Sequence, residues 1–241
     1  DRAGQRAGHA VARRPRRVSG DPPPPSPLAT QLVPRCTFPA PGTAVTCAVS
    51  GGADSLALLV LAVAAGCRVE AVHVDHGLRA GSAAEAEVVA AAAARYGAGF
   101  RAERVHVGQG PNLEARARAA RRAVLPPDVL TGHTTDDQAE TVLLNLLRGA
   151  GLDGLGAMAP AGHPLLGLRR ADTVALCAAE GLQPVVDPSN DDGAFRRNRL
   201  RHELLPLLDR LAERDLAPVL ARQADLLRDD AALLDELAGT L

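Results

Sequence analysis

The sequence has almost no aromatic residues: one tyrosine, three phenylalanines and no tryptophan occur among 241 residues. Hydrophobic residues nevertheless make up 46% of the chain. A core of alanine, valine and leucine is therefore expected, which favours helices and parallel strands over an aromatic-rich β-sandwich. A chain of this length can bury one large α/β domain, or a smaller domain with an appendage.

Lysine is absent as well, so all 27 basic residues are arginine. Guanidinium groups pair well with phosphate, but beside so much alanine the exclusive use of arginine is better explained by codon bias. The 27 basic residues are nearly balanced by 28 acidic ones. The net charge therefore argues neither for nor against a polyanionic partner.

The four cysteines lie far apart and form no Cys-x-x-Cys pair, which argues against a disulfide framework or a zinc knuckle. The apolar run LALLVLAVAAGC is shorter than the ~18 residues of a membrane span. The basic N-terminus lacks the apolar core of a signal peptide. We therefore predict a cytoplasmic protein with no membrane partner, preceded by a disordered leader, rich in proline and arginine, over residues 1–42.

From residue 43 onward, short β-prone runs alternate with helical segments. We expect strands at 43–49, 68–75, 100–107, 128–133 and 164–168, and helices at 54–66, 82–97, 112–125, 134–149 and 171–181. This alternation predicts an α/β fold over residues 43–186, with right-handed crossovers and a doubly wound parallel sheet. Residues 187–241 show helical patterns only and are predicted to form a helical appendage. The apolar face of its last amphipathic helix would be covered by a homodimer partner or by a further domain.

Polar residues gather where three of the predicted strands end. Ser50 to Ser55 follow the first strand, His76 to Arg79 the second, and His133 to Glu140 the fourth. The carboxyl ends of parallel strands meet at one edge of a sheet, where ligands of α/β proteins bind. The three polar stretches are therefore expected to line one site.

The first of these stretches, SGGADS, consists of Ser50, Gly51, Gly52, Ala53, Asp54 and Ser55. A glycine turn ahead of a helix presents successive N–H groups to an anion, and the helix dipole adds to the attraction. A carboxylate at Asp54 would repel phosphate unless Mg²⁺ lay between them, so the stretch predicts a magnesium nucleotide. The Walker lysine and the Gly-x-Gly-x-x-Gly pattern are absent. Alternatively, the turn is structural, with Asp54 or Ser55 as a helix cap.

SGGADS resembles the pyrophosphate loop of the N-type ATP pyrophosphatase (PP-loop) superfamily, whose members adenylate a substrate and release pyrophosphate. Three more stretches closely resemble the tRNA(Ile)-lysidine synthetase family: VDHGLR at 74–79, TGHTTDDQAETVLLNLLRGAGLDGLGAM at 131–158 and DPSNDDGAFRRNRLRHELLP at 187–206. The likeness covers roughly residues 44–210. It implies an adenine nucleotide alpha hydrolase-like fold, with ATP bound by the loop and Mg²⁺ held at Asp54.

The resemblance implies an ATP-dependent C–N ligase that attaches free L-lysine to C2 of the wobble cytidine in an isoleucine tRNA with a CAU anticodon. In the first implied step, O2 of the cytidine attacks the α-phosphate of ATP, which gives an adenylated base and pyrophosphate. In the second step, the ε-amine of lysine displaces AMP. The amine must lose a proton to attack, so a base is needed near C2; a histidine or a carboxylate from the second or fourth loop could serve.

Helical spacing places His133, Asp137 and Glu140 on one face of the predicted fourth helix. Clustered carboxylates are costly without a cation, and the resemblance implies that Asp137 and Glu140 contact the ammonium groups of lysine. The alternative is that they are ordinary acids of a helix N-terminus, favoured by its dipole. The candidate catalytic residues are Asp54, His76 and His133.

Three arginines are candidates for contacts with phosphate or with the lysine carboxylate: Arg148, Arg197 and Arg201. The last two share a helix face at i, i+4, and the resemblance implies that a functional arginine lies in their stretch. Two rival functions stay open. A tRNA thiolase of the same superfamily would also adenylate a base, although such enzymes typically use cysteine pairs or an iron–sulfur cluster. A non-catalytic module that binds nucleotide or tRNA is the other rival.

Overall fold

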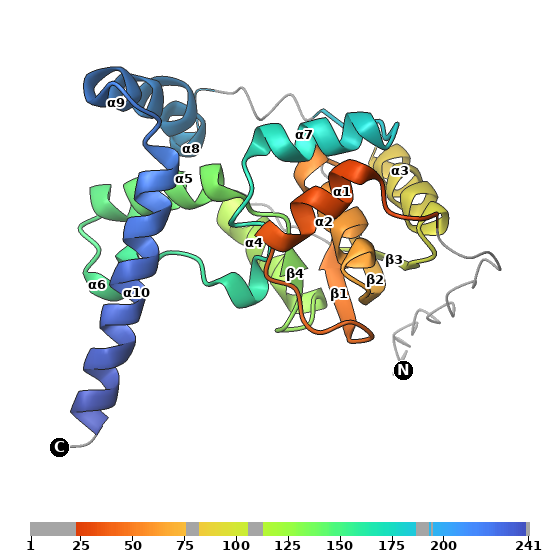
Figure 1. The fold of residues 1–241 in the computed structure, drawn as a ribbon, viewed down its shortest axis with the longest axis horizontal. Helices are drawn as coiled ribbons and strands as arrows, with labels where there is room; N and C mark the ends of the chain where they lie inside the picture. The colour runs from red at the N-terminus through yellow and green to blue at the C-terminus, as the bar shows by residue number, and fades with distance from the viewer. Residues whose placement is uncertain (1–22, 76–81, 106–112, 187–192, 194, 240–241) are drawn as a thin grey trace, which may run out of the picture.

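A four-stranded parallel sheet forms the centre of the fold, with the strand order β3–β2–β1–β4 (Figure 1). The structure is a computed structural model that describes residues 23–75, 82–105, 113–186, 193 and 195–239. The strands are β1 (Ala44–Ala48), β2 (Arg68–Asp75), β3 (Gly99–Arg104) and β4 (Leu130–Thr131). The predicted α/β fold with a parallel sheet is confirmed.

The helices between the strands follow the predicted alternation. They are α2 (Ala53–Ala64), α3 (Ser82–Arg95) and α4 (Leu113–Val124). Because βαβ crossovers are right-handed and the strand order reverses between β1 and β4, α2 and α3 cover one face of the sheet and α4 returns on the other. This is the predicted doubly wound arrangement, and ligands bind where such an order reverses. The reversal lies between the ends of β1 and β4.

Helix α2 is buried along most of its length, which explains its nearly continuous apolar sequence. It lies between the sheet and two outer helices, α1 (Pro27–Leu32) and α7 (Arg170–Ala179). Leu56, Leu58, Leu59 and Leu61 are all fully buried. The outer layer is functionally relevant because α7 begins beside the N-terminus of α2.

Part of the stretch that we assigned to a disordered leader is folded. Helix α1 packs against α2 and α7, with Ala29 and Leu32 buried. The 3₁₀ turn η1 (Val33–Arg35) follows it, and Arg35 pairs with Asp172 of α7. Ser26 caps α1 by accepting a hydrogen bond from the Ala29 N–H at 3.2 Å, and a proline at the first helical position is well tolerated. The predicted boundary at residue 42 is therefore wrong. The helix was missed because six residues are too few to show a helical period in the sequence. Residues 1–22 lie outside the described residues.

The strand predicted at 164–168 is also wrong. These residues form a turn whose N–H groups bond locally, as from Leu168 to the Leu165 carbonyl at 2.9 Å. Leu165 and Leu168 are fully buried, so the apolar run reflects burial in the core. Periodicity alone cannot separate a short buried turn from a short buried strand.

The C-terminal helices are built onto α5 (Thr135–Leu147) and do not stand apart (Figure 1). They are preceded by α6 (Leu152–Leu155) and η2 (Pro160–Gly162), and comprise α8 (Arg196–Arg199), the π-helical turn η4 (Leu200–Leu204), α9 (Leu205–Ala212) and α10 (Ala217–Gly239). A second, smaller apolar cluster joins them, formed by Ala139, Leu143, Leu200, Leu205 and Ala217. In the part of the chain that the structure describes, no helix has the length and apolar character to cross a membrane.

Candidate active site

The SGGADS turn joins β1 to α2 and is held in shape by its own residues. Gly51 has a φ of +93°, a left-handed conformation that side-chain-bearing residues rarely adopt. The Ser55 hydroxyl accepts a hydrogen bond from the Ser50 N–H at 3.1 Å and donates one to the Gly52 carbonyl at 2.9 Å. Ser55 is buried, so its hydroxyl braces the turn, whereas Ser50 is exposed.

The N–H groups that follow this brace are available for an anion. Among the described residues, none accepts a hydrogen bond from the N–H groups of Gly51, Gly52, Ala53 or Asp54. They lie at the N-terminus of a 12-residue helix, where the dipole favours negative charge. One side of the turn is covered by Val185, whose N–H donates to the Gly51 carbonyl at 3.0 Å.

The Asp54 carboxylate points to α7 and is bound there by two side chains. The Thr173 hydroxyl donates to one carboxylate oxygen, and the Arg170 Nε lies 3.5 Å from the other. Burial raises the pKa of Asp54 above its usual value, and the hydrogen bond from Thr173 and the nearby Arg170 oppose this without cancelling it. Helix α7 therefore fixes the one carboxylate of the glycine turn.

The turn after β4 touches the glycine turn through Gly132. A Cβ atom on Gly132 would lie 2.5 Å from the Asp54 carbonyl oxygen and 2.8 Å from its carbonyl carbon. Only a residue without a side chain permits this approach of two backbones. The ends of β1 and β4 thus meet where the strand order reverses.

Helix α5 begins after this contact and brings Asp137 and Glu140 to the same place. One oxygen of Asp137 accepts hydrogen bonds from the Thr134 N–H at 2.9 Å and the Thr134 hydroxyl at 3.0 Å, which caps the helix. The other oxygen lies 2.9 Å from Arg170 and 3.2 Å from Arg197. Burial raises the pKa of Asp137, but the attraction of Arg170 and Arg197 and the hydrogen bond from the Thr134 N–H outweigh it, so the pKa lies below its usual value.

Glu140 is the most deeply buried member of the cluster, with 1% of its side chain exposed. Arg197 Nε lies 2.6 Å from one of its oxygens, and Arg201 Nε lies 2.7 Å from the other. Arg197 comes from α8 and Arg201 from η4. Four of the predicted residues are thus brought together, with Arg197 and Arg201 paired to Asp137 and Glu140.

Arg170 is a site residue that sequence reasoning missed. It is the first residue of α7, and its guanidinium reaches Asp54, Asp137 at 2.9 Å and Glu140 at 3.6 Å. The available signal was an Arg-Arg pair directly ahead of a predicted helix. The hydrogen bond from Arg170 to Asp137 spans 33 residues of the chain, so no local pattern reports it.

Comparison with known proteins shows the family. A model described as the PP-loop domain matches residues 28–208. The chain is 51% identical over 216 residues to a tRNA(Ile)-lysidine synthase of Nocardia farcinica, covering 85% of this chain and 67% of that relative. It is 44% identical over 236 residues to that of Thermobifida fusca, covering 90% of this chain and 72% of that relative.

This chain belongs to the tRNA(Ile)-lysidine synthase family of PP-loop proteins. It spans about two thirds of the length of the curated family members that it matches, such as 67% of one and 65% of another. Among solved structures it is similar to the U34-tRNA thiolase NcsA of Methanococcus maripaludis, with a TM-score of 0.65, 15% identity, and coverage of 83% of this chain and 78% of that one. At this identity the likeness shows the fold alone.

The NcsA structure contains a [4Fe-4S] cluster. In this member of the lysidine synthase family, all four cysteines are free, and Cys47, Cys67 and Cys177 are buried. Within the described residues, no group of three or more His, Cys, Asp and Glu side chains could hold a metal ion. The family assignment argues against the thiolase alternative.

The remaining lysidine synthase candidates are placed differently. His133 lies beside the cluster, with its Nδ1 2.8 Å from the Thr131 hydroxyl, and burial, together with other charges, lowers its pKa to about 4. Its imidazole is therefore neutral at neutral pH and a weak base. Arg148 is the C-cap of the 13-residue α5, so at 1.5 Å per residue it lies roughly 17 Å from Asp137 and does not join the cluster. His76 lies outside the described residues.

Proposed function

We propose that this chain attaches free L-lysine to C2 of the wobble cytidine in tRNA-Ile with a CAU anticodon, and releases AMP and pyrophosphate. The observation that carries the proposal is the contact between the glycine turn and the start of α5. This contact brings an anion-binding turn and two carboxylates together at one sheet edge in a chain of this family. An anion site beside an acidic site suits ATP and a diamino acid.

The glycine turn would bind the triphosphate of ATP. The N–H groups of residues 51–54 and the dipole of α2 would stabilise negative charge on the leaving pyrophosphate. Since these donors are already oriented by the Ser50–Ser55 brace, they need little reorganisation when the cytidine O2 attacks the α-phosphate. Ala53 contributes through its backbone, and Ser50 is the exposed hydroxyl that could reach a phosphate oxygen.

The residues present fit Mg²⁺ only together with a nucleotide. Nucleotide-bound Mg²⁺ usually takes one or two carboxylates from the protein and keeps phosphate and water ligands, and Asp54 is such a carboxylate. No metal cage is formed by protein side chains alone among the described residues. When bound, the ion would offset charge between Asp54 and the phosphates.

The acidic cluster would bind lysine. Asp137 and Glu140 already bind cationic groups, namely the guanidinium groups of Arg170, Arg197 and Arg201. A lysine ammonium group could replace one of these, and a displaced arginine could then pair with the lysine carboxylate. The alternative is that the ion pairs only hold α5 against α7 and α8. His133, neutral at neutral pH, could accept a hydrogen bond from the attacking amine.

The activity is tested with the full chain, ATP, Mg²⁺, radiolabelled lysine and an isoleucine tRNA transcript with a CAU anticodon. We expect labelled lysine in the RNA and one pyrophosphate for each lysine attached. A matched transcript with uridine in place of the wobble cytidine should accept none. Nucleotide binding without pyrophosphate release would instead support the non-catalytic alternative, and pyrophosphate release that needs a sulfur donor would support a thiolase.

The last helix supports a proposal about assembly. On α10, Leu220, Ala224, Leu227, Ala231, Leu234 and Ala238 follow each other at alternating steps of four and three residues, the spacing of a helix–helix seam. The first four are at least partly buried where α10 packs on α5 and α6, and the last two are exposed. We propose that a second copy of the chain covers the exposed end, as in a twofold dimer.

Light scattering after size exclusion should therefore give the mass of a dimer for the unmodified chain. Leu234→Arg should give a monomer, because a charged group would enter the seam. Val174→Arg, at a valine of similar exposure on α7, should remain dimeric. A monomeric unmodified chain would rule the dimer out.

A cytoplasmic location also stays a prediction; cell fractionation that places the protein elsewhere would contradict it.

A further inference from the structure

Six charged side chains meet at the junction of the two proposed substrate sites. Asp54, Asp137 and Glu140 carry three negative charges, and the arginines Arg170, Arg197 and Arg201 carry three positive charges. The charges of the described cluster therefore cancel. Because the cluster is largely shielded from water, a charge added by a ligand is only weakly screened.

Arg170 differs from the other two arginines in its contacts. Its Nε lies 3.5 Å from Asp54, its Nη2 lies 2.9 Å from Asp137, and its Nη1 lies 3.6 Å from Glu140. Each nitrogen of the planar guanidinium thus faces a different carboxylate. Arg197 and Arg201 pair with Asp137 and Glu140, and among the described residues neither pairs with Asp54.

The contact with Asp54 makes Arg170 part of the nucleotide site as well. Among the described residues, Arg170 is the only cationic partner of Asp54, and the Thr173 hydroxyl from the same helix holds the other oxygen. Its side chain is 30% exposed, so a ligand can approach it from solvent. One side chain therefore bridges the glycine turn and the acidic pair.

We propose that Arg170 is a positioning residue that couples the binding of the nucleotide to the binding of lysine. The proposal rests on the proposed function. Lysine adds a cation to a neutral cluster and displaces arginine charge from Asp137 and Glu140. The anionic nucleotide at the glycine turn stabilises the displaced positive charge. Each ligand therefore strengthens the binding of the other, and the two effects are equal because coupling free energies are reciprocal.

The adjacent Arg169 supplies a matched control. It is similarly exposed at 33%, lies 2.7 Å from Asp136 and also pairs with Asp215. It thus makes strong ion pairs one residue away from Arg170. It contacts neither Asp54 nor the acidic pair among the described residues. A variant at Arg169 removes a guanidinium from the same turn but leaves the bridge intact.

The test is calorimetric titration of the full chain with L-lysine, with and without Mg²⁺ and α,β-methylene-ATP, an analogue that cannot release pyrophosphate. For the unmodified chain, the analogue should lower the dissociation constant of lysine by about fivefold or more. In Arg170→Gln, this ratio should fall to about one. Arg170→Gln should bind the analogue alone more weakly than the unmodified chain does. It should bind lysine alone at least as tightly as the unmodified chain, because the loss of the guanidinium leaves the cluster with a net negative charge.

Two further variants separate coupling from a loss of structure. Arg170→Lys keeps the charge and should retain part of the coupling, and Arg169→Gln should keep the ratio of the unmodified chain. Weaker binding of both ligands by Arg170→Gln, an unchanged ratio in that variant, or no coupling in the unmodified chain would overturn the proposal. If Arg170→Gln does not fold, a ratio in Arg170→Lys equal to that of the unmodified chain would overturn it. Coupled binding without transfer of lysine to tRNA would count against the proposed function alone.

Discussion

Asp54→Ala is expected to lower the rate of pyrophosphate release by about a hundredfold or more. A loss of this size is typical when charge stabilisation is removed from a transition state. Asp54 is the carboxylate of the glycine turn, and α7 holds both of its oxygens. Without it, the phosphates would lose their candidate magnesium ligand, and Arg170 would lose one of its partners. The measurement is the rate of pyrophosphate release with saturating tRNA, ATP and Mg²⁺.

Asp137→Asn is the contrasting variant for that measurement. Asparagine has nearly the same shape and can still accept from Thr134, so the cap of α5 should persist. Pyrophosphate release should be retained, whereas more lysine should be needed for half-maximal transfer. If both variants fail alike at the first step, the division of roles between the glycine turn and α5 is wrong.

Gly132→Ala is expected to destabilise the fold by about 3 kcal/mol, the upper range for overpacking of a tightly packed site. The new Cβ would meet the Asp54 carbonyl oxygen at 2.5 Å and the Ser55 nitrogen at 3.1 Å. Both are backbone atoms at the start of α2, so relief would require the helix or β4 to move. Nucleotide binding should weaken with it, since the same backbone shapes the glycine turn.

The measurement for Gly132→Ala is the free energy of unfolding in urea, together with the affinity for the ATP analogue. Gly162→Ala is the matched control, because its nearest neighbour, the Val129 carbonyl oxygen, would lie 3.9 Å from the added Cβ. It should leave both quantities nearly unchanged. Equal free energies of unfolding for the two variants would contradict this prediction, because they would show that the backbone at Gly132 can move away from Asp54 at little cost.

The sequence was most informative where local geometry determines the structure. A glycine turn between an apolar strand and an apolar helix restricts the conformation of both flanks, so the position of Ser50 to Ser55 could be predicted. The spacing of Asp137 and Glu140 on α5 followed in the same way from helix periodicity. Both features depend on residues within a few positions of each other.

The partners of those residues depend on tertiary packing and could not be predicted. Arg197 and Arg201 contact Glu140 from 57 and 61 residues away, and no local pattern reports such a pairing. Arg170 likewise reaches Asp137 from 33 residues away. Helix α1 was missed because its six residues follow a proline-rich stretch and are stabilised mainly by contacts with α2 and α7.

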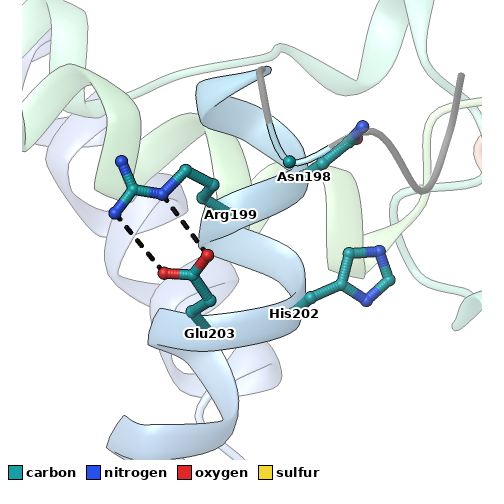
Figure 2. A pocket seen from close by; sticks show the side chains of 5 residues that line it. Asn198, Arg199, His202 and Glu203 are labelled. Carbon is teal, nitrogen blue, oxygen red and sulfur yellow. Dashed lines mark hydrogen bonds and ion pairs between the residues drawn. The ribbon is translucent and has the colours of Figure 1, made fainter.

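A hollow of about 350 Å³ lies beside α8 and η4, and Figure 2 shows side chains that line it. It is lined by Gly193, Asn198, Arg199, His202 and Glu203. Arg199 and Glu203 pair with each other at 3.3 Å across one helical turn. The same short segment therefore carries two sets of charged residues, with Arg197 and Arg201 directed to α5 and the hollow on its outer surface.

The π-helical turn Leu200–Leu204 lies between α8 and α9, in a helical segment that contacts both carboxylates and apolar side chains. A π turn holds one residue more than an α turn, and each residue of a helix advances the direction of its side chain by about 100°. The extra residue therefore changes the direction in which the following side chains point around the helix axis. Arg197 precedes the turn and Arg201 lies within it, and both face the Glu140 carboxylate of α5. Leu205 follows the turn and belongs to the apolar cluster of Ala139 and Leu143.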